Sequence, residues 1–84
     1  MENKMQTLRV IYEMVQHDLK PSVKNILPNE IISRSPLPWD KIMQHLDELH
    51  DESFINMKRS LVVVINITQK GIEQASILQP VKAH

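Results

Sequence analysis

The sequence predicts a small α+β domain, and three observations carry this prediction. Apolar residues recur at helical spacing in segments before and after a group of prolines. A β-branched run at Leu61–Ile67 then has strand character, and a last segment regains helical spacing. Because the chain has 84 residues, we expect one domain over 1–84, with its core region at Leu8–Leu78 and a frayed tail at 79–84.

The first helix is predicted from Glu2 to about Leu19. No proline or glycine interrupts this segment. Its apolar side would hold Met5, Leu8, Ile11, Tyr12 and Val15. Pro21 disfavours helical backbone at the preceding residue, so the helix is expected to end just before it. The connector that follows is expected to carry at most a minimal strand, at Val23–Ile26.

Two further helices are predicted around the prolines. Pro28 suits the first turn of a short helix that is expected to reach about Arg34, and Pro36 prevents its continuation. Pro38 opens a longer helix that is expected to run to about Asp51 or Glu52. The apolar side of this third helix would hold Trp39, Ile42, Met43, Leu46 and Leu49.

A β-hairpin is predicted after the third helix. Its first strand is expected at Phe54–Lys58, with a turn at Arg59 and Ser60 whose type the sequence does not fix. The face of the second strand that packs on the helices is expected to hold Leu61, Val63, Ile65 and Ile67. The other face carries Val62 and Val64, and an apolar second face is typical of a strand that is covered on both sides or meets a partner.

A last helix is predicted after the hairpin. Thr68 suits its N-cap, Ile72 and Ala75 would face the core, and Pro80 closes it. Gly71, the only glycine, falls in its first turn. This glycine either allows another group to approach closely or is tolerated at a cost of ~1 kcal/mol. The three aromatic residues, Trp39, Tyr12 and Phe54, are expected to pack between the first and third helices. Trp39, near the start of the third helix, could instead lie partly exposed and contact a nucleotide or a partner.

The composition limits the functions open to the chain. Ten basic and ten acidic residues cancel, and the absence of cysteine removes disulfides and thiolate metal sites. The chain shows no nucleophile elbow and no glycine-rich phosphate loop, so we expect no enzyme activity, cofactor or small-molecule ligand. His45 and His50 are spaced too poorly for a metal site. Without a signal peptide or a membrane-spanning stretch, a cytoplasmic protein is expected.

Two phrases resemble one known family. "WDKIMQHLDELHDESFI" is similar to the third helix of winged helix-turn-helix domains and its exit, through Leu46, Leu49, Phe54 and Ile55. "INITQKGIEQA" is similar to the step from strand to helix in that family, through Ile67, Thr68, Lys70, Gly71 and Glu73. Together with the order of elements, these phrases resemble a winged helix-turn-helix DNA-binding domain of the small prokaryotic transcription-regulator type.

The resemblance implies double-stranded DNA as the partner. The third helix would enter the major groove and present Lys41, Gln44 and His45 to base edges. Lys58 and Arg59 would form a basic wing tip, and Arg34 and Ser35 would contact the phosphate backbone. In that reading the DNA-binding residues are Arg34, Ser35, Lys41, Gln44, Lys58 and Arg59.

A second interpretation comes from the charge of the third helix. Lys41 is its only basic residue among several acids, and such a helix would suit a winged helix that acts as a protein–protein interaction module without DNA binding. A homodimer is also expected, because the terminal helices offer apolar residues. These are Met5 and Leu8 at one end, and Ile77 and Leu78 at the other.

Overall fold

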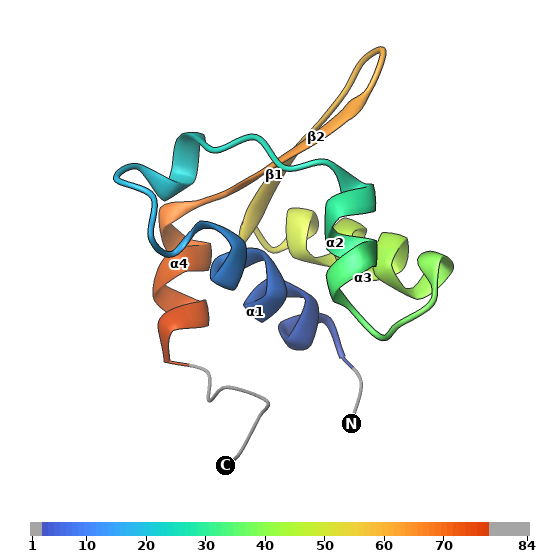
Figure 1. Cartoon of the computed structure of the whole chain (residues 1–84), viewed down its shortest axis with the longest axis horizontal. Helices are drawn as coiled ribbons and strands as arrows, with labels where there is room; N and C mark the ends of the chain where they lie inside the picture. The colour runs from blue at the N-terminus through green and yellow to red at the C-terminus, as the bar shows by residue number, and fades with distance from the viewer. Residues whose placement is uncertain (1–2, 78–84) are drawn as a thin grey trace.

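A computed structural model describes residues 3–77 of the chain (Figure 1). Over these residues the fold is α+β, with four α-helices, one short 3₁₀-helix and one antiparallel hairpin. The elements run in the order α1 (Lys4–Val15), η1 (Pro21–Val23), α2 (Pro28–Arg34), α3 (Trp39–Asp51), β1 (Ile55–Arg59), β2 (Val63–Ile67) and α4 (Gln69–Ser76). The predicted α+β class and the order of its main elements are confirmed.

Helix α1 is shorter than the sequence suggests. Its N-cap is Asn3, whose Oδ1 accepts hydrogen bonds from the backbone N–H groups of Met5 and Gln6 at 2.8 and 3.3 Å. The helix ends at Val15, so the predicted end near Leu19 is wrong. Leu19 is fully exposed and gains no burial from another helical turn, whereas the chain has to turn here toward η1.

The connector between α1 and α2 forms a helical turn rather than the predicted minimal strand. Pro21 starts η1, where its fixed φ suits a helical turn. Ile26 alone pairs with a strand, through an antiparallel bridge to Ile65 with N···O distances of 2.9 and 2.8 Å. The prediction of a strand at Val23–Ile26 therefore holds for its last residue only. Through this bridge the connector is fixed to the outer edge of β2.

Helices α2 and α3 follow the proline signals in the sequence. Pro28 is the first residue of α2, and Leu27 N–H donates to the Glu30 carboxylate at 3.0 Å, which closes the helix start. Pro38 is the N-cap residue of α3. Both predicted helices are confirmed. The fixed φ of proline suits the start of a helix, where its missing N–H group is not needed for a hydrogen bond.

The hairpin differs from the prediction in its turn. The register pairs Ile55 with Ile67 and Arg59 with Val63, so the turn comprises Ser60–Val62 instead of Arg59 and Ser60. Leu61 lies in this turn and is fully exposed; the prediction that it packs on the helices is wrong. The register leaves it outside the ladder.

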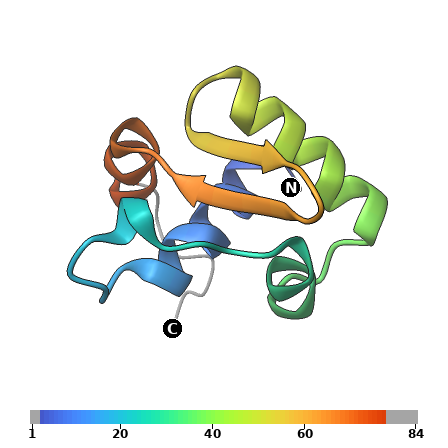
Figure 2. The same cartoon turned by 90° about the horizontal axis from the view of Figure 1, so that it is seen from above.

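The core lies between the helices and the inner face of the hairpin. This inner face consists of Ile55, Met57, Ile65 and Ile67, all buried. It packs against buried residues of the helices that include Leu8, Ile11, Ile31, Ile42, Leu46 and Leu49. Figure 2 shows β1 on the side of α3 and β2 on the side of the connector before α2. The hairpin extends away from the helices (Figure 1).

Gly71 marks a tight junction between α3, the hairpin and α4. A Cβ at this position would collide with the Phe54 carbonyl oxygen and would lie 2.9 Å from Ile67 Cγ1. Thr68 secures the junction: its hydroxyl accepts from Gly71 N–H at 2.9 Å, and its N–H donates to the Phe54 carbonyl at 3.1 Å. Of the two interpretations of Gly71, the close approach is confirmed, and so is the Thr68 N-cap.

Candidate nucleic-acid interface

The exposed face of α3 is mostly acidic. The side of the helix that faces the core consists of Ile42, His45, Leu46 and Leu49. Asp40, Gln44, Asp47 and Asp51 are all exposed and recur at positions i, i+4, i+7 and i+11, which places them along one stripe. We call these four residues the α3 stripe. Gln44 is its only uncharged member and the one that can donate a hydrogen bond to a base edge.

Lys41 and Trp39 are also exposed in the first turn of α3. Trp39 is 60% exposed, so the prediction that it packs between the first and third helices is wrong. Trp39 is the first residue of α3, and the buried side of the helix begins only one turn later, at Ile42. Of the other two aromatic residues, Phe54 is buried and Tyr12 is half-buried.

His45 is turned toward the core instead of outward. Its Nδ1 lies 2.8 Å from the hydroxyl of Thr7 in α1, and both residues are buried. The expectation that His45 contacts bases is therefore wrong. A polar residue within the apolar period of α1 was the available signal, because a buried threonine needs a hydrogen-bond partner.

Lys58 and Arg59 lie within β1 and not at the tip of the hairpin. Successive side chains of a strand point to opposite faces, so the two cations face different surroundings. Arg59 reaches α3, where its Nη2 donates to Asp47 Oδ1 at 2.5 Å. Lys58 is exposed and lies with Asn56 on the face of the hairpin away from the core.

Arg34 and Ser35 lie in a groove next to α1. This groove has a volume of about 210 Å³ and is lined by Gln6, Val10, Glu13, Arg34, Ser35, Pro36 and Leu37. The Ser35 hydroxyl accepts a hydrogen bond from Leu37 N–H at 3.2 Å, which shapes the turn between α2 and α3. The six predicted DNA-binding residues thus fall into several surroundings: this groove, the exposed side of α3 and the two faces of the hairpin.

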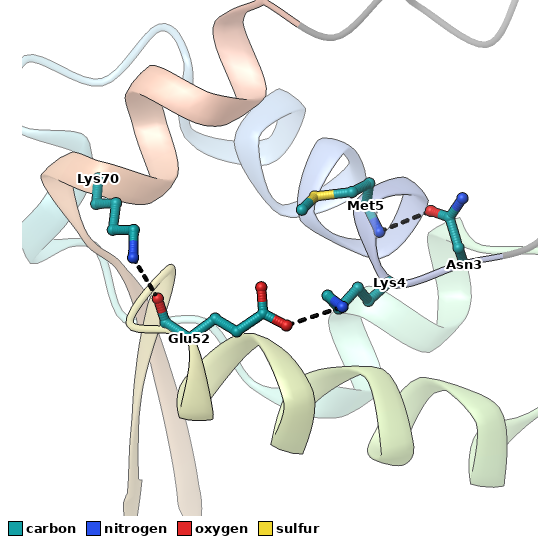
Figure 3. A network of polar contacts seen from close by, with 5 residues as sticks. All are labelled: Asn3, Lys4, Met5, Glu52 and Lys70. Atoms are coloured by element: carbon teal, nitrogen blue, oxygen red, sulfur yellow. Dashed lines mark hydrogen bonds and ion pairs between the residues drawn. The ribbon is translucent and has the colours of Figure 1, made fainter.

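Two lysines lie at the C-terminal end of α3 (Figure 3). Lys4 pairs with the Glu52 carboxylate at 2.8 Å, and Lys70 donates to the Glu52 carbonyl oxygen at 2.8 Å. The hydrogen bond from Lys4 to Glu52, together with the charge of that carboxylate, raises the pKa of Lys4 above its ordinary value. Positive charge near a helix C-terminus is favourable. The Lys4 contact ties α1, and the Lys70 contact ties α4, to the C-terminal end of α3, and both lysines offset acidic charge there.

The terminal residues predicted to form a dimer differ in exposure. Leu8 is completely buried in the core, so its predicted role as an exposed edge is wrong. Met5 is half-buried, and Ile77 is 71% exposed. Leu78 lies outside the described residues. One of the four predicted residues therefore presents a large exposed apolar side chain within residues 3–77.

Within residues 3–77 there is no group of three His, Cys, Asp or Glu side chains arranged to hold a metal ion. Over the same residues, no helix has the length and hydropathy needed to cross a membrane. Comparison with protein-family models, with curated proteins and with solved structures finds no match for this chain.

Proposed function

We propose that this chain is a winged helix-turn-helix domain that binds double-stranded DNA as a transcription regulator. The order of α1, α2, α3, the hairpin and α4 supports this proposal. The observation that carries it is the exposed first half of α3, where Trp39, Lys41 and Gln44 all have exposed side chains. These side chains offer donors for base edges and an aromatic surface for a sugar or a base.

The acidic residues in α3 are compatible with DNA binding because of their contacts. Asp47 is paired with Arg59, and Glu52, just after the helix, is paired with Lys4. In the first half of the helix the charges of Asp40 and Lys41 cancel. The negative charge that remains on α3 then comes from Glu48 and Asp51, in its C-terminal half, which in this proposal lies farther from the bases.

The α3 stripe favours a second candidate function, a protein–protein interaction module. Three of its four residues are aspartates, Asp40, Asp47 and Asp51. An acidic helix face of this kind is complementary to a basic protein surface. In this alternative the domain binds no DNA. Neither candidate function requires the homodimer that is expected from the terminal helices.

A binding titration separates the two candidate functions. Fluorescence anisotropy of a labelled random duplex at low salt is expected to show binding that weakens steeply as salt rises. Lys41→Gln should reduce the affinity. Lys70→Gln, an equal change of charge in α4 beside the C-terminal end of α3, should have a smaller effect. Absence of any binding at tens of micromolar protein in low salt would contradict the DNA-binding proposal and leave the interaction module.

A further inference from the structure

The outer face of the hairpin forms a polar pocket with the connector before α2. Asn56 and Lys58 of β1 and Asn66 of β2 share this face, and the register places Asn56 directly opposite Asn66. The connector crosses beside them. The pocket is open, has a volume of about 270 Å³ and is lined by Ser22, Val23, Asn25, Asn56, Lys58 and Asn66. We call it the outer pocket.

Asn66 organises the outer pocket and orients its neighbour. It is only 9% exposed, and its Nδ2 donates to the Lys24 carbonyl at 2.8 Å and to Asn25 Oδ1 at 2.9 Å. Both bonds hold the connector against β2. Because Asn25 Oδ1 accepts from Asn66, the NH₂ group of Asn25 is the end of its amide that can donate to a ligand.

The outer pocket is rich in hydrogen-bond donors and has positive charge. Lys58 supplies an ammonium group, Ser22 a hydroxyl, and Asn25 and Asn56 supply amide N–H groups. Among the described residues that line it, none carries a carboxylate, although the chain has ten acidic residues in all. Lys24, between the lining residues Val23 and Asn25 of the connector, adds a second positive charge nearby. Such a concentration of donors matches a ligand that only accepts hydrogen bonds and carries negative charge.

We propose that the outer pocket binds a phosphate group. Its donors come from two segments, the connector with Ser22 and Asn25 and strand β1 with Asn56 and Lys58, so they can approach a tetrahedral oxyanion from two directions. A planar carboxylate offers only two oxygens and would leave part of this donor set without a partner. Lys58 provides the charge, and Asn66 is a positioning residue that keeps the connector in place. The inference concerns a face other than α3 and stands independently of DNA binding.

Titration with inorganic phosphate tests this site by NMR. At constant ionic strength, phosphate should cause saturable shifts of the side-chain amide resonances of Asn25 and Asn56, and acetate should cause much smaller ones. Lys58→Met, a change at an exposed side chain that preserves the fold, should abolish these shifts. Lys41→Met, the same change on α3, should leave them intact. No saturable shift in the wild type, or an unchanged response in Lys58→Met, would overturn the proposal.

A second titration identifies the source of the phosphate group. If a short DNA duplex shifts the same amide resonances and competes with inorganic phosphate, the DNA backbone is the ligand. If inorganic phosphate shifts them and the duplex does not, the pocket takes a free phosphate or a small phosphorylated molecule. The phosphate response also separates this inference from the proposed function, because it persists in a protein that binds no duplex.

Discussion

The two faces of the hairpin come from the same ten strand residues and have opposite characters. The inner face holds Ile55, Met57, Ile65 and Ile67 in the core, while the outer face holds Asn56, Lys58, Val64 and Asn66. For this second face the sequence left two alternatives, a cover from the same chain or a partner, and the connector contacts it through Lys24 and Asn25, which accept hydrogen bonds from Asn66. A β-branched run therefore indicates a strand covered on both sides without indicating which segment covers it.

The largest difference between the faces should appear when one methyl-rich side chain is removed from each. Ile65→Ala is expected to lower the free energy of unfolding by about 4 kcal/mol, because it leaves a cavity at the centre of the core. Val64→Ala, at a half-buried position on the outer face, should lower it by only about 1 kcal/mol. Urea denaturation measures both variants, and similar losses in the two would contradict the assignment of the faces.

The junction between the inner face and α4 predicts the next largest effect. Gly71→Ala should destabilise the protein by about 3 kcal/mol, because its Cβ meets the Phe54 carbonyl oxygen and a backbone group cannot move aside easily. Gln74→Ala in the same helix serves as the control and should be neutral within about 0.5 kcal/mol. A stable Gly71→Ala variant with an unchanged thermal midpoint would show that this junction is not close-packed.

On the outer face, Asn66 should matter for stability more than its neighbour Asn56. Asn66→Ala removes two hydrogen bonds to the connector and is expected to cost about 2 kcal/mol. Asn56→Ala, an exposed position directly across the ladder, should cost less than about 0.5 kcal/mol. Hydrogen exchange at Ile26 N–H, which donates to Ile65, should accelerate only in Asn66→Ala; equal exchange in both variants would refute the positioning role.

The smallest expected effect on stability concerns Lys4 of α1, which pairs with Glu52 at the C-terminal end of α3. Its folded-state pKa is raised by Glu52, so its stabilising contribution is fully present below the ordinary lysine value of 10.5 and is lost as pH rises through the folded pKa. Wild-type stability should therefore show a decline above that pH that is absent in Lys4→Met. Urea midpoints across the alkaline range measure it, and parallel curves for the two proteins would argue against the ion pair.

Local chemistry made part of this fold predictable. Pro28 and Pro38 mark the starts of α2 and α3, and Thr68 marks the start of α4, because each acts through its own backbone or that of the next turn. The end of α1 and the length of the hairpin turn were not predictable in this way. They depend on whether the rest of the fold offers Leu19 and Leu61 an apolar surface to pack against, and the spacing of apolar residues in the sequence does not contain this information.

The candidate site was predictable in residue type but not in arrangement. The sequence shows Lys58 and Arg59 as neighbouring cations, but the pleat of the strand places them on opposite faces. Arg59 then forms an ion pair with Asp47, twelve positions away in the sequence. The contact between Thr7 and His45 spans 38 positions. Such pairs arise from the packing of helices and strands, so residue spacing alone cannot identify them.

The most direct test of this account compares the salt dependence of duplex binding in three proteins: wild type, Lys58→Met and Arg59→Met. Lys58 is exposed on the outer face, so its removal should reduce the magnitude of the slope of log K against log salt by about one. Arg59 is paired with Asp47, and its removal should leave that slope closer to the wild-type value. A slope that is reduced in magnitude by Arg59→Met and not by Lys58→Met would contradict the account, in which Lys58 contacts phosphate and Arg59 pairs with Asp47.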